Sequence, residues 1–240
     1  MNPLAWIGDA YPTHCLTLGR GLAGRDLLLR LGVGSTEMFQ PRDEDEANEF
    51  VWAGMEDYWN WGAARAGEAG GWAYVPEPAS IWGSLSERLK AASSGTELIC
   101  CSYADAMETV AYWRDRVLLA QFETASPQQR SGQEPDILEE PMRRVGLWDS
   151  APAGLRHAGL DLLHELTGVA LSQEETASAL TGKLPAMGLG PEAMPEDSSA
   201  PTPAARPADA AGGPVGMLPA PRLADSAKSA PGQGRKRARA

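Results

Sequence analysis

Three closely spaced apolar runs between residues 95 and 122 constrain the fold more than any other stretch of this sequence. The runs cover residues 96–103, 109–113 and 117–122. In the last run, apolar side chains occupy both alternating faces, which is typical of a strand covered on both sides. The stretch therefore predicts a β-hairpin at the centre of a buried sheet. Its turn at 114–116 is expected to be long or bulged because it lacks glycine.

Further strands and several short helices are predicted around this hairpin. Strands are expected over 14–18 and 72–75, where β-formers lie between turn residues. Ser-x-x-Glu capping boxes at 84–87 and 172–175 and glycines at helix ends predict helices over 25–31, 84–93, 152–168 and 172–180. The predicted fold class is α+β: an antiparallel-rich sheet of about five strands, flanked by short helices, with a C-terminal helical pair alongside.

Composition divides the chain unevenly. Residues 186–240 contain no aromatic residue, no Ile and no Cys, and Pro, Ala, Gly and Ser dominate there. Such a segment buries too little apolar surface to offset its ordering entropy, so it is predicted to be disordered. The predicted organisation is a core domain over 1–125, a linker over 126–136, a helical segment packed on the core over 137–185, and the tail.

Charge argues against binding of the folded part to nucleic acid. Residues 1–185 carry 14 Lys and Arg against 27 Asp and Glu, whereas residues 186–240 carry 7 against 5. An acidic domain is a poor electrostatic match for nucleic acid or an anionic membrane. The tail ends in a short basic cluster at 235–239, which we interpret as a solvated end, although it could contact an anionic partner.

A cytoplasmic location is predicted from three absences. The N-terminal residues lack the charged and apolar regions of a signal peptide, and no apolar run approaches the roughly 20 residues of a membrane span. The three cysteines, Cys15, Cys100 and Cys101, are too few for a disulfide framework. They are predicted to be buried thiols, with Cys100 and Cys101 on opposite faces of a strand.

Several short motifs, in their order along the chain, resemble those of a known family. The motifs lie at 15–21, 30–32, 71–78, 94–96 and 166–172. Their order is similar to that of an uncharacterised actinobacterial domain family of unknown function. The resemblance implies a shared fold and brings no established activity. The sequence departs from the family where Ala79-Ser80 follows the Glu-Pro pair, a place where similar proteins continue with Asn-Gly, and in the aromatic insert over 52–61.

Aromatic residues and one pair of charged residues are the candidate binding groups. Tryptophan and tyrosine suit binding surfaces because they combine large contact area with a polar group, although the same residues also pack against sheets. Each of the charged residues flanks a strand in a family motif, so the two are expected to meet, either as a buried ion pair or in a site. The candidate binding residues are Arg20, Trp52, Trp59, Trp61, Trp72 and Glu77.

Two motifs suggest a cofactor site and a metal site, but we interpret both as structural features of the fold. Gly19–Gly24 spells G-x-G-x-x-G between a strand and a helix. The helix is too short, and the second parallel strand of a dinucleotide site is missing. His157, Asp161 and His164 share one side of a predicted helix and form a weak metal candidate. That side lies opposite the leucine stripe, so it is predicted to face solvent. No cofactor or metal is therefore predicted.

The favoured hypothesis is a non-catalytic, cytoplasmic binding protein that presents an acidic surface to an unidentified protein partner, in an immunity-like or regulatory role. No catalytic residue is predicted, because no nucleophile elbow, zinc motif or P-loop occurs in the sequence. The alternative is a small-molecule-binding protein or enzyme with a pocket near Arg20, Trp72 and Glu77. The sequence does not specify an oligomeric state.

Overall fold

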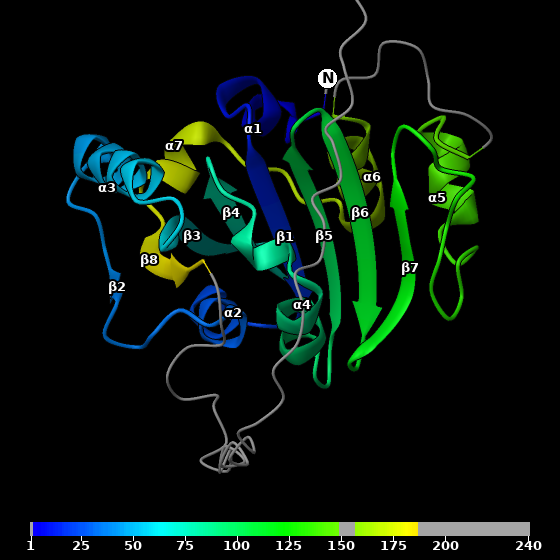
Figure 1. Cartoon of the computed structure of the whole chain (residues 1–240), viewed down its shortest axis with the longest axis horizontal. Coiled ribbons are helices and arrows are strands. Elements are labelled where there is room, and N and C mark those ends of the chain that lie inside the picture. Colours follow the sequence, from blue (N-terminus) through cyan, green and yellow to red (C-terminus); the bar gives the residue numbers. More distant parts are fainter. Residues whose placement is uncertain (1, 149–156, 187–240) are drawn as a thin grey trace, which may run out of the picture. The chain divides into compact units, whose positions relative to one another are not determined.

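The protein is built around one antiparallel sheet, shown by a computed structural model that describes residues 2–148 and 157–186 (Figure 1). Eight strands lie in the order β2-β8-β3-β4-β1-β5-β6-β7, and each neighbouring pair is antiparallel. The strands are β1 (His14–Arg20), β2 (Met38–Phe39), β3 (Trp61–Ala69), β4 (Trp72–Pro78), β5 (Glu97–Ala104), β6 (Met107–Arg114), β7 (Val117–Glu123) and β8 (Leu180–Pro185). The predicted α+β class is confirmed, but the predicted number of about five strands is wrong.

Short helices connect and cover these strands. Three helices lie beyond the hairpin in the chain, and the others precede it. They are α1 (Ala5–Ala10), α2 (Gly24–Leu31), α3 (Glu44–Glu56), α4 (Ser86–Ala92), α5 (Glu139–Arg144), α6 (Ala158–Thr167) and α7 (Gln173–Ala177), with a 3-10 turn η1 (Trp82–Ser84). Among the described residues, none of these helices has the length and apolar character that a membrane span requires.

The predicted central hairpin is confirmed, but its turn is tighter than expected. Arg114 pairs with Val117, so Asp115 and Arg116 alone form the turn. Their φ angles of 45° and 68° are both positive, as a two-residue type I′ turn requires. The Asp115 carboxylate accepts the Gly95 N–H at 2.9 Å and so helps to hold the turn. The irregularity lies instead in a register shift between Tyr112 and Trp113.

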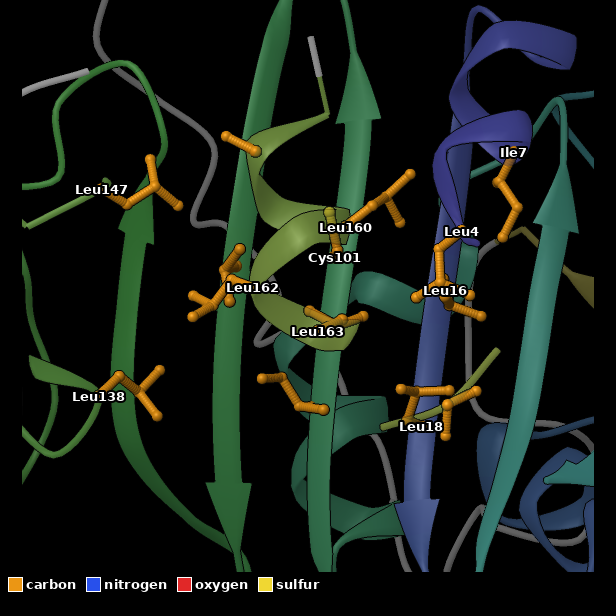
Figure 2. Close-up of a cluster of buried hydrophobic side chains, with 14 of the residues drawn as sticks. Leu4, Ile7, Leu16, Leu18, Cys101, Leu138, Leu147, Leu160, Leu162 and Leu163 are labelled. Carbon is orange, nitrogen blue, oxygen red and sulfur yellow. The ribbon is translucent and has the colours of Figure 1, made fainter. Parts of the chain in front are cut away.

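The central strands are buried on both faces, as their apolar runs predicted. Leu16, Leu18 and Ile99 lie in a core cluster on one face, together with side chains of α1, α5 and α6. In Figure 2, Leu162 and Leu163 of α6 lie over this face of the sheet. The opposite face holds a second cluster formed with side chains of α2 and α4. Because side chains alternate along a strand, consecutive residues of one strand lie in different core clusters.

The three cysteines follow this alternation. Cys100 and Cys101 lie in different core clusters, so the prediction that they point to opposite faces is confirmed. Cys15 and Cys100 are near neighbours, with their sulfur atoms 3.4 Å apart. All three are buried and free. The hydrogen bond with Cys100, together with burial, raises the pKa of the Cys15 thiol, and burial raises the pKa of the Cys101 thiol. The cysteines therefore act as apolar packing groups.

The helix-end predictions are partly confirmed. Gly32 closes α2 in the left-handed conformation, and Ser172 and Glu175 form the predicted capping box of α7. Ser84 does not cap α4, because its hydroxyl donates to the Ile81 carbonyl within η1 and Leu85 takes the N-cap position. That capping-box prediction is wrong, since the chain forms a 3-10 turn before the helix begins.

The C-terminal helical pair is present, but it is followed by an unexpected strand. The helix predicted over 172–180 ends at Ala177 as α7, and residues 180–185 form β8 between β2 and β3. The helix predicted over 152–168 appears as α6 from Ala158, and Leu155 lies outside the described residues. The C-terminal segment therefore completes the sheet in addition to packing on it.

One edge of the sheet is already hydrogen-bonded, and the other is formed by a very short strand. At one edge, backbone groups of Ser131, Gln133 and Glu134 bond to β7 at 2.8–2.9 Å. Part of the predicted linker over 126–136 thus lies along this strand. At the other edge, β2 has only two residues. The predicted disordered tail lies outside the described residues except for Ala186.

Candidate functional site

An exposed aromatic surface lies on α3 and the turn that follows it. Trp52, Met55 and Trp59 are 63%, 44% and 81% exposed, respectively. The opposite side of α3 is buried through Ala47, Val51 and Gly54. We call the three exposed residues the α3 surface. Large apolar side chains gathered on an exposed face mark a candidate interaction site.

The helix is built so that this surface also becomes acidic. The Asp43 side chain caps α3 by accepting the Glu46 N–H at 2.9 Å, and carboxylates in the first turn suit the positive end of the helix dipole. No Lys or Arg occurs from residue 43 to residue 64. Helix α7, which contacts α3 (Figure 1), adds exposed Glu174 and Glu175. The exposed indoles therefore lie on a segment rich in exposed carboxylates, which include Glu49 and Glu56 of α3.

A small hollow adjoins the α3 surface. Its volume is about 310 Å³, and it is lined by Thr13, Met55, Tyr58, Ala79, Ala104 and Asp105. The Trp82 indole N–H donates to the Tyr58 carbonyl at 3.1 Å, and their rings lie 5.0 Å apart. These contacts anchor the turn that presents Trp59.

The predicted aromatic group separates into exposed and buried members. Trp61 is only 6% exposed and packs with Val51 and Ala63 in a small core cluster, so it does not belong to the α3 surface. Trp72 is half-buried on the opposite side of β4 from Val75. Among the candidate tryptophans, only Trp52 and Trp59 are strongly exposed. Sequence reasoning missed Met55, although its helical spacing from Trp52 and Trp59 was visible.

A second candidate site is a cavity where the ends of four adjacent strands meet. Its volume is about 610 Å³, and its lining comes from β4, β1, β5 and β6, the β3–β4 turn and the end of α6. The lining residues are Arg20, Gly70, Gly71, Trp72, Glu97, Ile99, Tyr112, Arg114, Leu166 and Thr167. The candidate residues Arg20 and Trp72 are therefore brought together.

Glu77 is not part of this cavity, so the expected meeting of Arg20 and Glu77 is wrong. Arg20 pairs with Trp72 at one end of β4, whereas Glu77 pairs with Cys15 near the other end. Arg20 is exposed and binds Glu97 at 3.1 Å. The pairing register of β1 and β4 separates the two residues along the strands, and the sequence alone does not specify that register.

Glu77 instead holds a loop inside the protein. Its carboxylate is fully buried and accepts the Gly83 N–H and the Ser80 hydroxyl, each at 3.0 Å. Burial raises the pKa of Glu77, while these hydrogen bonds and the nearby Arg88 guanidinium oppose that rise. The carboxylate serves as a structural anchor between β4 and η1.

The weak metal candidate does not assemble. The side chain of His157, at the N-cap of α6, is 9% exposed, the Asp161 carboxylate accepts the Asn2 amide N–H at 2.6 Å, and His164 contacts the Val169 carbonyl. Within the described ranges, no three His, Cys, Asp or Glu side chains are placed to hold a metal ion. The prediction of a solvent-facing side is wrong for His157, because its ring packs against Gly8 and Asp9 of α1.

His157 and His14 form a buried imidazole pair instead. Their ring centroids lie 6.0 Å apart, and Tyr103 stacks on His14 at 5.6 Å. The Asp9 carboxylate lies 3.6 Å from His157 Nε2. Glu108 is buried nearby and accepts the Gly159 N–H at 2.9 Å. In the described part of the chain, His14 Nε2 and both His157 ring nitrogens have no hydrogen-bond partner.

The burial of His14 predicts a loss of stability in mild acid. Burial lowers the pKa of His14 below its ordinary 6.5, and repulsion from His157 acts in the same direction. The unfolded chain therefore binds more protons, so the free energy of unfolding falls as pH drops through 6.5. The slope from one group is at most about 1.4 kcal/mol per pH unit.

Urea unfolding of the wild-type protein and His14→Gln across this pH range checks the prediction. We expect the wild type to lose stability toward acid more steeply than the variant, since glutamine does not titrate. Parallel curves for the two proteins would show that His14 carries no such penalty.

The glycine-rich connection is structural, as predicted. Gly21 has a φ of +64° in the turn after β1, and the Gly24 N–H at the start of α2 donates to the Glu68 carboxylate at 3.1 Å. A carboxylate thus occupies the place where a dinucleotide site would hold phosphate. The neighbours of β1 are antiparallel, unlike those of a dinucleotide-binding fold.

Comparison with known proteins gives a family without an assigned activity. Residues 5–185 match the model of a family described as "Family of unknown function (DUF6461)". No curated protein and no solved structure matches the chain. The resemblance to a domain family of unknown function, drawn above from short motifs, is thereby confirmed.

Proposed function

The chain belongs to the DUF6461 family, whose function is unknown, and we propose from the geometry that it is a binding protein whose α3 surface receives an arginine-rich segment of another protein. The observation that supports this proposal is the pair of indoles, 63% and 81% exposed, within an acidic surface. The proposal involves no catalytic step. It refines the expected immunity-like or regulatory role, in which the protein would neutralise a basic partner.

Arginine suits this surface better than lysine for two reasons. A guanidinium stacks on an indole face and forms paired hydrogen bonds with a carboxylate, whereas an ammonium acts as a point charge. Helix α3 offers both partners, since Glu49 and Glu56 are exposed on the same helix as Trp52 of the α3 surface. A single segment could therefore place guanidinium groups on the rings and on the carboxylates together.

The adjoining hollow supports the same class of partner. Asp105 lies in its lining together with Met55 and the Tyr58 ring. A long side chain with an apolar stem and a cationic end fits such a lining, because the stem contacts the apolar groups and the charge faces Asp105. We include Asp105 in the proposed binding region.

Short peptides of equal length and charge test the proposal. Polyarginine is expected to bind the full chain more tightly than polylysine in a fluorescence-anisotropy titration. Replacing both indoles (Trp52→Ala with Trp59→Ala) is expected to weaken the polyarginine complex about 5- to 30-fold, because two exposed cation–π contacts contribute about 0.5–1 kcal/mol each. The preference for arginine should disappear in the same variant.

Matched variants separate stacking from general charge attraction. Met107→Ala with Val117→Ala removes two exposed apolar side chains elsewhere and should leave both affinities unchanged. Glu49→Gln with Glu56→Gln should weaken both peptides more than Glu87→Gln with Glu123→Gln, which removes the same charge from other exposed sites. Equal binding of polyarginine and polylysine, unaffected by loss of the indoles, would contradict the proposal.

A further inference from the structure

The cavity at the strand ends has a charge opposite to that of the molecule. Across β4, β1, β5 and β6, its lining includes Trp72, Arg20, Glu97 and Arg114 in that order. Glu97 Oε2 lies 3.1 Å from Arg20 Nη1, and Glu97 Oε1 lies 3.0 Å from Arg114 Nε. Two guanidinium groups and one carboxylate leave one positive charge here, whereas the whole chain has a net charge of −11.

The guanidinium groups retain donors for a ligand. Each arginine side chain has five N–H donors. Within the described part of the chain, the side-chain hydrogen bonds of Arg20 involve Nη1, and those of Arg114 involve Nε and Nη2, the latter donating to the Tyr112 hydroxyl at 3.1 Å. The other N–H groups are available for a bidentate contact with an anion, which is the geometry that guanidinium favours.

Tyr112 adds a neutral donor to the same wall. Burial raises the pKa of Tyr112, so its hydroxyl stays protonated at neutral pH. Since the hydroxyl oxygen accepts a hydrogen bond from Arg114, its own proton can be donated to a ligand oxygen. The cavity thus offers two kinds of donor on one side.

The lining also includes apolar side chains. Trp72 and Leu166 are partly buried against the core, and Ile99 is buried. The β3–β4 turn closes one side, where Gly70 and Gly71 have φ angles of 60° and 83° and lack side chains that would narrow the entrance. The volume of about 610 Å³ falls within the range of about 300–1,000 Å³ typical of small-molecule sites.

We propose that this cavity binds a small aromatic carboxylate. Its carboxylate accepts from the N–H groups of Arg20 and Arg114 that Glu97 does not use and from the Tyr112 hydroxyl, and its ring packs against Trp72. One negative charge matches the single positive charge of the Arg20–Glu97–Arg114 group, whereas a phosphate dianion exceeds it. The site is separate from the α3 surface and goes beyond the proposed partner binding.

Benzoate, benzamide and inorganic phosphate are the probes for this site. In ligand-observed NMR titrations of the full chain, benzoate is expected to bind saturably and at least tenfold more tightly than benzamide, its neutral analogue, or phosphate. Arg20→Gln and Arg114→Gln are each expected to weaken benzoate at least tenfold. Arg116→Gln, an exposed arginine at the tip of the same hairpin, should leave the affinity unchanged.

Each outcome of these titrations decides the proposal. Both cavity arginines are substantially exposed, so their variants are expected to fold, and circular dichroism checks this. The proposal is overturned if benzoate does not saturate, if benzamide binds equally well, or if Arg20→Gln and Arg114→Gln bind benzoate as the wild type does. The variant lacking Trp52 and Trp59 should bind benzoate normally, so a failure here is distinguishable from a failure of the partner-binding proposal.

Discussion

Replacing Glu77 by alanine is expected to lower the free energy of unfolding by about 2–6 kcal/mol, because two buried donors lose their acceptor at about 1–3 kcal/mol each. The carboxylate is fully buried and accepts hydrogen bonds from Gly83 and Ser80. Without it, the Gly83 N–H and the Ser80 hydroxyl lose their partner inside the core, and the positive charge of Arg88 loses a neighbouring negative one. Urea unfolding followed by tryptophan fluorescence measures the change.

Glutamine at the same position separates hydrogen bonding from charge. Because burial raises the pKa of Glu77 above its ordinary 4.5, the folded protein binds the proton more tightly. The stability contributed by that proton is present below pH 4.5 and is lost as pH rises through the folded-state pKa. Glutamine does not titrate, so the free energy of unfolding of Glu77→Gln should lack this pH-dependent decrease. At neutral pH, Glu77→Gln should lower the free energy of unfolding less than Glu77→Ala does.

Exposed Glu87 on α4 supplies the control for these variants. Glu87→Ala is expected to change the free energy of unfolding by no more than about 0.5 kcal/mol, as is usual for a surface substitution. If Glu77→Ala were as mild as Glu87→Ala, the carboxylate would not be the anchor described here.

Removal of β8 is expected to have a still larger effect. A chain that ends at Ala179 should fail to fold cooperatively, whereas a chain that ends at Ala186 should unfold in one transition. The strand bonds to β3 along Leu180–Pro185 and to β2 on its other side. Its loss exposes the ladder of β3 and removes fully buried Leu184 from the core.

A point variant checks that packing as well as length matters. Leu184→Ala is expected to cost about 2–5 kcal/mol, the usual range for a buried leucine, with folding retained. Circular dichroism and urea unfolding compare the three proteins. Cooperative folding of the chain ending at Ala179 would mean that β8 is an appendage and not a part of the sheet.

The sequence predicted the parts of the fold in which side-chain pattern and local structure agree. The hairpin over 96–122 was predictable because its apolar side chains fill both faces of each strand. Strand β3 was missed because alanine and glycine, which dominate it, have low β propensity and create no alternating pattern. Strand β8 was missed because glycine and proline interrupt Leu180–Pro185, and its strand conformation is set by pairing with β3.

The candidate sites were predictable only where exposure followed from sequence spacing. Trp59 and Trp61 are two residues apart, yet one is 81% exposed and the other 6% exposed, because the chain leaves a turn and enters β3 between them. Glu97 and Arg114 were missed at the cavity because their pairing depends on the register between β5 and β6, which the apolar runs do not specify. In the structure the two residues lie directly opposite each other on these strands.

The closed edges of the sheet restrict how any partner can recognise this protein. One edge already bonds to residues 131–134, and the other is only two residues long. In the part of the chain that the structure describes, the edge strands therefore present few unpaired backbone groups with which an incoming peptide could extend the sheet. For the proposed partner binding, this geometry favours recognition by side chains, and single substitutions at the α3 surface would then change which partner binds without disturbing the backbone that presents them.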